Sequence, residues 1–377
     1  MSYPKKVSYV RLGNSGLKVS KIILGCMSYG SPEWQAWVLP EEEGIKHIKA
    51  AYDAGINTFD TANARIQREV YSNGLSEVIL GTAIKQHNLP REEIVVMTKV
   101  RCRFCLRAGG DDERARLSAQ IIIQVFGEVK RNISEGWTPN VDPDTVGYVN
   151  QHGLSRKHIF DSVKHSLERL QLDYIDVLQC HRFDKDTPIE ETMEALHDVV
   201  KAGWVRYIGM SSCWAYQFNA MQNYAIQNKL TPFISMQNHY SLAYREEERE
   251  MFPTLKQYGV GAIPWSPLAR GRLTRPLDQQ TKRGETDRSF GVYSKAKEST
   301  EAIVNRVEEL AKKKGCSMAQ LSLAWIMSKP GVTAPIVGTT SLENLQDLIG
   351  AVDIKLSEED VKYLEEPYHP QAVIGHW

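Results

Sequence analysis

Cysteine is scarce in this sequence, with six residues in a chain of 377. That density is far below the disulfide frameworks that hold small secreted proteins together. One C-x-x-C pair, Cys102-Arg-Phe-Cys105, has no second pair and no histidine pair at zinc-finger spacing. We therefore expect neither a disulfide scaffold nor a metal site.

An excess of one charge and long apolar runs are also missing. The 46 Lys+Arg residues balance the 46 Asp+Glu residues, which argues against general affinity for nucleic acid or for an anionic membrane. No apolar run approaches the ~20 residues of a membrane helix, and the first ten residues lack the apolar centre of a signal peptide. We expect a cytoplasmic protein with a globular composition.

The sequence does contain short apolar runs that alternate with amphipathic stretches, a pattern typical of parallel strands joined by crossover helices. The eight predicted strands are Lys21–Gly25, Thr58–Ala62, Ile94–Val100, Ile175–His181, Tyr207–Ser212, Ile234–Asn238, Gly261–Ser266 and Thr333–Gly338. Eight such units predict an α/β fold, a (β/α)₈ TIM barrel. An open dinucleotide-binding sheet competes, but no G-x-G-x-x-G fingerprint follows the first strand.

Apolar residues recur at intervals of three and four between the strands, which predicts helices. These are Pro40–Ala54, Ser72–Gln86, Arg156–Leu170, Ile189–Ala202, Trp214–Asn228, Arg245–Tyr258 and Ser341–Ala351, with additional helices at Ser299–Lys314, Ser317–Ser328 and Ser357–Glu366. At the other end, Val7–Ser20 alternates apolar and polar residues around Asn14-Ser15-Gly16 and predicts a β-hairpin that plugs or caps the barrel. We expect residues 1–377 to form one domain, since such barrels exceed 400 residues with insertions.

Two segments lack the apolar periodicity of the strands and helices in this fold, and we interpret them as atypical insertions. They are residues 64–69 (ARIQRE) and 107–150, the latter inside a long connection from Arg101 to Gln151. The long segment is a candidate active-site lid. An alternative explanation is that ARIQRE and the stretch around Ser118–Trp137 are translated non-coding sequence, which sequencing of the transcript would decide.

Polar side chains occur where several predicted strands end, and the ends of parallel strands form the active face of a barrel. Three of the predicted strands end in Asp60, Lys99 and His181, and Tyr71 follows in the loop after Asp60. An ammonium beside a phenol favours the phenolate and makes tyrosine a usable proton donor near neutral pH. Each residue alone has a simpler explanation: a helix cap, a solvated lysine, a packed tyrosine or a core histidine. Together they are suited to polarise a carbonyl.

Eight separated motifs then show a resemblance to the aldo-keto reductase superfamily, in particular its fungal aryl-alcohol-dehydrogenase-like branch. They are LGCMSYGS, FDTA with YSNGLSE, VVMTKV, LDYIDVLQCHRFD, PIEETMEALHDVVKAGWVRYIGMSS, ISMQNHYSLAYREEEREMFP, IPWSPLARGRLTR and PIVGTTSLENL. The resemblance covers nearly the whole chain except 101–151, 275–298 and the tail. It implies an NADP(H)-dependent oxidoreductase that reduces an aldehyde or ketone to an alcohol, or runs the reverse.

The resemblance also implies a role for each motif residue. Tyr71 is then the general acid, Asp60 and Lys99 tune it, and His181 orients the carbonyl. Ser211 and Gln237 hold the carboxamide of NADPH or NADP⁺, with Trp265 under the nicotinamide ring, and Asp60 and Ser212 are further cofactor-binding candidates. The cofactor-binding candidates also include Gly25, Cys26 and Met27. Around the pyrophosphate they are Ser266, Leu268, Arg270, Gly271 and Arg272, and near the 2′-phosphate they are Gly338, Thr340 and Asn344.

One departure from the family pattern is the spacing between Asp60 and Tyr71. The family places the tyrosine closely, as D-T-A-x-x-Y, whereas the two residues here are eleven positions apart, and removing Ala64–Glu69 would restore the pattern. We expect the insertion to bulge outward and return Tyr71 to the site. The alternative is a catalytically impaired or regulatory NADP(H)-binding barrel. A metal-dependent barrel hydrolase is disfavoured, because the strand ends offer one His and one Asp rather than a His cluster. The exact carbonyl substrate, with aromatic ones among the candidates, and the oligomeric state are not encoded in these motifs.

Overall fold

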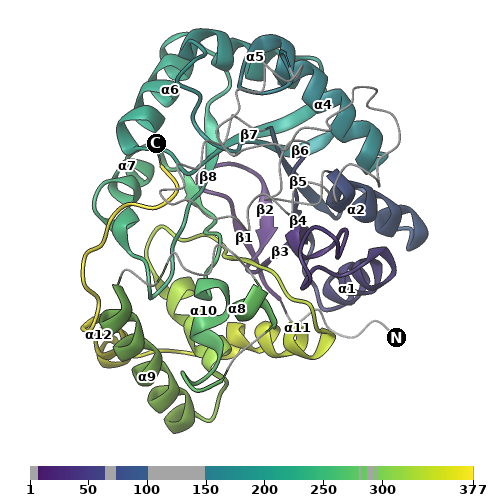
Figure 1. The fold of residues 1–377 in the computed structure, drawn as a ribbon. Coiled ribbons are helices and arrows are strands. Elements are labelled where there is room, and N and C mark those ends of the chain that lie inside the picture. Colours follow the sequence, from purple (N-terminus) through teal and green to yellow (C-terminus); the bar gives the residue numbers. More distant parts are fainter. Residues whose placement is uncertain are drawn as a thin grey trace, which may run out of the picture.

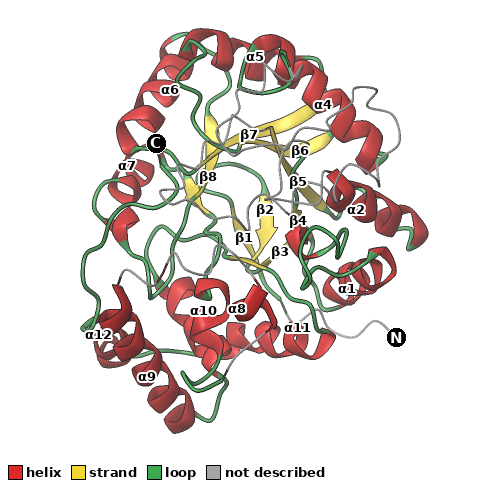
Figure 2. Cartoon of the chain, in the orientation of Figure 1, coloured by secondary structure: helices red, strands yellow, loops and turns green. Residues whose placement is uncertain are grey.

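The structure is a computed structural model that describes residues 7–63, 74–100, 149–279, 282–286, 293 and 296–376. Its centre is one curled sheet of eight parallel strands, surrounded by helices, which is the predicted (β/α)₈ barrel (Figures 1 and 2). The strands are β3 (Ile23–Gly25), β4 (Thr58–Asp60), β5 (Val95–Val100), β6 (Ile175–Cys180), β7 (Val205–Ser211), β8 (Phe233–Gln237), β9 (Gly261–Ala262) and β10 (Ile336–Val337). Every strand pairs with its neighbours in the order β10-β3-β4-β5-β6-β7-β8-β9.

The last two strands, β9 and β10, are shorter than the apolar runs predict. Pro264 and Pro335 stand inside those runs and have no backbone N–H for the ladder, so regular pairing stops beside them. Backbone bonds still connect the two runs, because the N–H of Thr333 donates to Ala262 O and that of Ile336 donates to Pro264 O, both at 2.8 Å. These bonds close the ring between the first and last strands of the sheet.

The helices lie outside the sheet, and most of them follow a strand directly in the chain, whereas α9, α10 and α12 follow other helices (Figure 1). They are α1 (Glu41–Asp53), α2 (Leu75–Gln86), α4 (Arg156–Leu170), α5 (Ile189–Lys201), α6 (Ala215–Gln227), α7 (Met251–Tyr258), α8 (Lys282–Thr286), α9 (Lys297–Lys314), α10 (Met318–Ser328), α11 (Leu342–Ile349) and α12 (Glu358–Glu365), with short 3₁₀ turns η1 (Cys26–Ser28), η5 (Glu246–Glu248), η6 (Ala269–Thr274) and η8 (Gly350–Asp353). None of these described helices is long and apolar enough to cross a membrane.

One predicted helix, Arg245–Tyr258, is divided in the structure. Its first residues form η5, and the α-helix α7 begins only at Met251. Pro253 lacks a backbone N–H and is tolerated only in the first turn of a helix, so a continuous helix from Arg245 is excluded.

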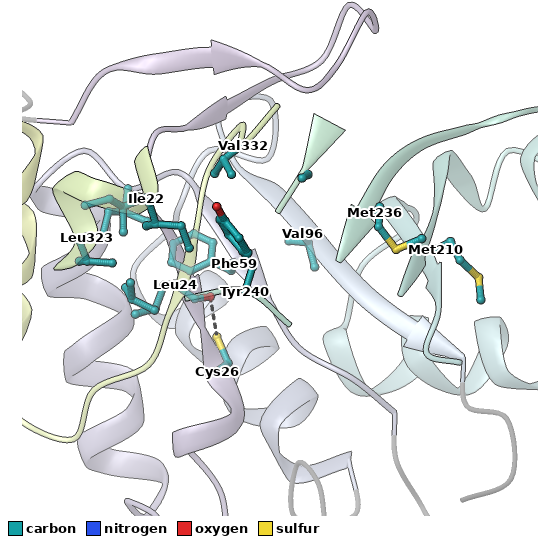
Figure 3. Close-up of a cluster of buried hydrophobic side chains, with 14 of the residues drawn as sticks. Ile22, Leu24, Cys26, Phe59, Val96, Met210, Met236, Tyr240, Leu323 and Val332 are labelled. Atoms are coloured by element: carbon teal, nitrogen blue, oxygen red, sulfur yellow. Dashed lines mark hydrogen bonds between the residues drawn. The ribbon is translucent and has the colours of Figure 1, made fainter. Parts of the chain in front are cut away.

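The core has two layers separated by the sheet. Leu24, Phe59, Val96, Met210 and Met236 belong to the larger cluster, which lies between the strands and the helices (Figure 3). Each large apolar side chain buried in this way contributes about 1.5–3 kcal/mol to folding.

The smaller cluster combines residues of several strands, such as Met97 and Val177, with two residues of the N-terminal hairpin. The hairpin consists of β1 (Tyr9–Arg11) and β2 (Lys18–Ser20), and its Leu12 and Val19 are fully buried in this cluster. The hairpin therefore packs against the barrel interior, as a plug would.

Candidate active site

Four polar side chains meet at the carboxyl ends of the strands, and we name them the strand-end cluster: Asp60 of β4, Lys99 of β5, Gln179 of β6 and Gln237 of β8. Strand pairing brings them to one level, since Lys99 is the register partner of Gln179. All four are buried, with exposed fractions of 0–3%. Buried charges and amides at one level of a barrel require partners within the cluster.

Lys99 and Asp60 form an ion pair at the centre of the strand-end cluster. The Nζ of Lys99 lies 2.6 Å from Oδ2 of Asp60 and donates a second bond to Thr61 O at 2.8 Å. Burial lowers the pKa of the Lys99 ammonium, the nearby Arg182 guanidinium lowers it further, and Asp60 opposes both effects. The site thus holds a lysine whose proton is less tightly bound than that of a solvated lysine.

The two glutamines complete the coordination of Asp60. Its Oδ1 accepts hydrogen bonds from Nε2 of Gln179 at 3.0 Å and from Nε2 of Gln237 at 2.9 Å, and Gln237 also donates to Oε1 of Gln179 at 3.0 Å. Gly209 leaves the room for this arrangement, since a Cβ at that position would lie 2.3 Å from Ser235 Oγ and 3.3 Å from Gln179 Cγ. Sequence reasoning missed Gln179, although a glutamine inside the apolar strand IDVLQC is itself a signal.

The loop that carries Tyr71 begins directly after β4. Tyr71 and the 64–69 insertion lie outside the described residues, but both ends of the loop are described. Thr61 Oγ1 donates to Ser76 Oγ at 2.8 Å, and Ser76 Oγ donates to Cys26 O at 2.8 Å. The start of α2 is therefore bound back to the end of β4, so the loop leaves and returns at the same place.

A second set of contacts fixes α2 beside the strand-end cluster. Glu77 is fully buried, and its carboxylate lies 2.6 Å from both Thr98 Oγ1 and Arg169 Nε. Thr98 is the residue before Lys99 in β5. The helix that follows Tyr71 is in this way connected to the strand that carries the lysine.

His181 follows the last residue of β6, where its backbone N–H donates to Val100 O at 2.8 Å. Its side chain is half-buried. The neighbouring Arg182 donates from Nη1 to the carbonyl of His181 at 2.5 Å and to Ser211 Oγ at 3.4 Å. Arg182 was not among the sequence candidates, and it connects the end of β6 to the end of β7.

The cofactor candidates Ser211, Ser212 and Trp265 lie together on the β7–β9 side of the barrel mouth. Ser211 Oγ donates to the carbonyl of Gln237 at 2.7 Å, and the indole Nε1 of Trp265 donates to Ser212 Oγ at 3.0 Å. Behind the indole the rings of His239 and Tyr244 continue as what we name the aromatic stack, Trp265–His239–Tyr244. Its ring centroids are 4.2 Å apart at each step, with interplanar angles of 9° and 10°.

The remaining candidates after Trp265 lie in a tightly wound loop. Ser266 and Arg270 have φ values of 52° and 58°, and Gly271 has a φ of 102°, a conformation that suits glycine. Together with Leu268 and Arg272 they are only partly buried. The loop therefore exposes backbone and guanidinium groups next to the indole.

Next to the run that carries Trp265, β10 leads into α11. Gly338 and Thr340 are exposed, and the backbone N–H of Asn344 donates to Ser341 Oγ, the cap of α11, at 3.3 Å. A Cβ at Gly338 would lie 3.1 Å from Ser28 Oγ and 3.6 Å from Gly25 O, so this end of β10 adjoins the end of β3.

Of the three candidates at the end of β3, Cys26 has its side chain in the hydrophobic core rather than at the mouth (Figure 3). Its Sγ lies 3.9 Å from Leu24 O, and burial raises the pKa of the thiol. Met27 is half-buried and Gly25 is the last residue of β3. A ligand at this corner would therefore meet the backbone of Cys26.

The part of the chain that the structure describes contains no group of three or more His, Cys, Asp or Glu side chains that could hold a metal ion. The buried cluster is instead one ion pair surrounded by amides. Such a site can orient and donate protons beside a bound organic ligand.

Comparison with known proteins agrees with this geometry. The Aldo/keto reductase family model matches residues 21–368. The versiconal hemiacetal acetate reductase of Aspergillus parasiticus is 48% identical over 370 residues, covering 97% of this chain and 98% of the relative. A candidate aryl-alcohol dehydrogenase of Schizosaccharomyces pombe is 50% identical over 374 residues, 97% of both chains. An aldo-keto reductase of Alternaria alternata is 46% identical over 370 residues, with 98% and 93% covered. The chain therefore belongs to the aldo-keto reductase family.

Proposed function

We propose that the protein is an NADPH-dependent reductase of aldehydes or ketones, able to run the reverse oxidation of an alcohol. Family membership supports carbonyl reduction in general. The observation that carries the proposal for this chain is the buried Lys99–Asp60 pair, 2.6 Å apart at the carboxyl ends of the strands. Burying such a pair is costly unless geometry and additional hydrogen bonds compensate, and functional sites are where such groups cluster.

The residues at the mouth fit an NADPH molecule. Trp265 is backed on one face by His239 and can stack its other face on a flat ring. Arg270 and Arg272 are suited to a pyrophosphate, and the N-terminus of α11, with Gly338, Thr340 and Asn344 near it, to a phosphate. When bound, the cofactor supplies the hydride.

The strand-end cluster fixes which way the Gln237 amide faces. An ionised carboxylate only accepts hydrogen bonds, so the Nε2 atom of Gln237 must face Asp60 Oδ1. The same Nε2 also donates to Gln179. Both amide protons are thus used inside the cluster, and Oε1 of Gln237 is the atom offered to the N–H₂ group of a nicotinamide carboxamide.

For the proton, we propose Tyr71 as the donor to the carbonyl oxygen, with His181 orienting that oxygen. The Lys99 ammonium, held by Asp60, would stabilise the phenolate that remains after the transfer. The names of the relatives include an aryl-alcohol dehydrogenase and a reductase of a hemiacetal acetate. We therefore propose an aromatic aldehyde or ketone as the substrate class.

The decisive experiment replaces Tyr71 by Phe and measures NADPH oxidation with an aromatic aldehyde, together with NADPH binding. General acid catalysis contributes about 10²–10⁴-fold, so turnover should fall by that factor while the dissociation constant of NADPH stays unchanged. Tyr216→Phe is the matched control, because that tyrosine is 69% exposed on α6. Unchanged turnover in Tyr71→Phe would remove Tyr71 from the mechanism. A wild-type protein that binds NADPH tightly without turnover would instead identify an impaired or regulatory barrel.

A further inference from the structure

His239 is the central ring of the aromatic stack and has a third aromatic neighbour outside the stack. It is 1% exposed, its faces are covered by Tyr244 and Trp265, and its edge meets Tyr293 at a centroid distance of 5.6 Å and an angle of 68°. Its Nε2 lies 2.7 Å from the hydroxyl of Tyr293, which is also 1% exposed. The imidazole is therefore held on both faces and on one edge.

The contacts of His239 join two points that are far apart along the chain. Trp265 directly precedes the loop with the proposed pyrophosphate ligands Arg270 and Arg272. Tyr293 follows that loop, shortly before α9 begins at Lys297. Residues on either side of the arginine loop thus meet at one imidazole, which comes from the end of β8.

The charges around this imidazole connect it to the same arginines. Burial is the main cause that lowers the pKa of His239 well below its ordinary value, and Arg270, Arg182 and His376 add to it. Tyr293 in turn acts electrostatically on Arg272. His239 is consequently neutral at physiological pH, and its contact with Tyr293 is a hydrogen bond between two neutral groups.

We propose that the His239–Tyr293 hydrogen bond is a clasp that positions the indole of Trp265 and the arginine loop for the dinucleotide, so that both residues act as positioning residues in cofactor binding. The inference rests on the proposed NADPH-dependent function and extends it to His239, a motif residue without an assigned role, and to Tyr293, which lies outside the motifs. The clasp holds the loop relative to the indole before the cofactor arrives. Losing it would therefore weaken binding more than it would slow the chemistry, which occurs at the strand-end cluster.

A double-mutant cycle separates the clasp from simple packing. His239→Phe keeps a ring in the aromatic stack but loses the nitrogen, and Tyr293→Phe keeps the ring but loses the hydroxyl. Each variant should raise the dissociation constant of NADPH about fivefold, as expected for one net hydrogen bond. The double variant should be no weaker than either single variant, because the same bond is removed. Turnover at saturating NADPH should stay within about twofold of wild type.

Tyr258→Phe is the matched control, since its hydroxyl bonds to Asn219 and Asn223 on α6, away from the stack. It removes a comparable phenol bond and should leave NADPH binding unchanged. Additive effects of the two clasp variants, or an unchanged dissociation constant in Tyr293→Phe, would overturn the clasp and leave the proposed function intact. A wild-type protein that does not bind NADPH would overturn the proposed function and the clasp with it.

Discussion

The strand-end cluster and the aromatic stack occupy neighbouring parts of the barrel mouth but are built in different ways. The four residues of the cluster belong to four strands and are aligned by backbone pairing, as in the register between Lys99 and Gln179. The stack takes its rings from positions after β8 and β9, where a single isolated β-bridge pairs His239 with Trp265 and a turn adds Tyr244. One is a buried polar network and the other is a set of ring contacts.

This difference implies different responses to mutation. A buried ion pair with shared hydrogen bonds fails as a unit when one member is removed, because the remaining charge is left in a low-dielectric interior. Ring contacts are individually worth about 0.5–1.5 kcal/mol beyond their buried area, so losses in the stack should be graded. Four predictions test this contrast, in descending order of effect.

The largest effect is expected from Lys99→Met. It leaves the Asp60 carboxylate buried without its cation, which costs about 3–5 kcal/mol in the free energy of unfolding. Turnover should fall about 10³-fold, since the proposed proton donor loses its ammonium partner. Urea unfolding and NADPH oxidation measure the two quantities.

The paired control is Asp60→Asn combined with Lys99→Met, which removes both charges. Stability should recover in part while turnover stays low. If Lys99→Met alone unfolds no more easily than wild type, the strand-end cluster is not the all-or-none unit described here.

The second prediction concerns Glu247 of η5, near the aromatic stack, whose Oε1 lies 3.3 Å from Nε2 of His376. Burial raises the pKa of Glu247 to about 8 and lowers that of His376 to about 4. Between pH 4.5 and 8 the folded protein keeps a proton on Glu247 that the unfolded chain releases, so this group's contribution to stability decreases as pH rises.

Glu247→Gln removes this titration and leaves the other groups unchanged. Relative to wild type, the variant should gain about 4 kcal/mol in the free energy of unfolding between pH 5 and pH 9. Urea unfolding of both proteins at the two pH values measures the difference. Parallel pH profiles would show that Glu247 titrates normally.

The third prediction compares two buried glutamines. Gln179→Leu removes a donor to Asp60 and the acceptor of Gln237, and should cost about 1–3 kcal/mol of stability. Gln222→Leu should cost a similar amount, since Gln222 bonds the backbone N–H and C=O of Phe233. Only Gln179→Leu should also shift the pH profile of turnover, because only Gln179 contacts Asp60. If the two variants have the same pH profile of turnover, Gln179 has only a packing role.

The smallest effect is expected in the aromatic stack. Trp265→Ala should weaken NADPH binding about tenfold, the value of one ring contact, with stability changed by packing alone. Trp265→Phe, which keeps a flat ring but loses the bond to Ser212, should recover most of the binding. Binding lost completely in Trp265→Ala would show that the stack, like the cluster, fails as a unit.

Periodicity and strand ends were sufficient to predict the barrel and the meeting of Asp60, Lys99 and Gln237, because parallel strands align their carboxyl ends by backbone geometry. The functional roles of these residues and the position of Tyr71 remain predictions. Gln179 stands one residue before the end of β6, as Lys99 does in β5, but it was not predicted because the expected strand Ile175–His181 placed His181 at that end. His239 and Tyr293 escaped because their contact joins positions without a shared period, which only the folded chain brings together.

The N-terminal hairpin has a consequence for how the chain folds during synthesis. The N–H of Asn14 donates to Gly259 O at 2.7 Å, so the hairpin is secured by a segment that is translated much later than the hairpin itself. At about 5–20 residues per second, the hairpin waits roughly 10–50 s for that acceptor to be translated. Until then this bond of the hairpin cannot form, and nascent chains stalled before residue 259 are the ones in which chaperones should find the barrel open at its base.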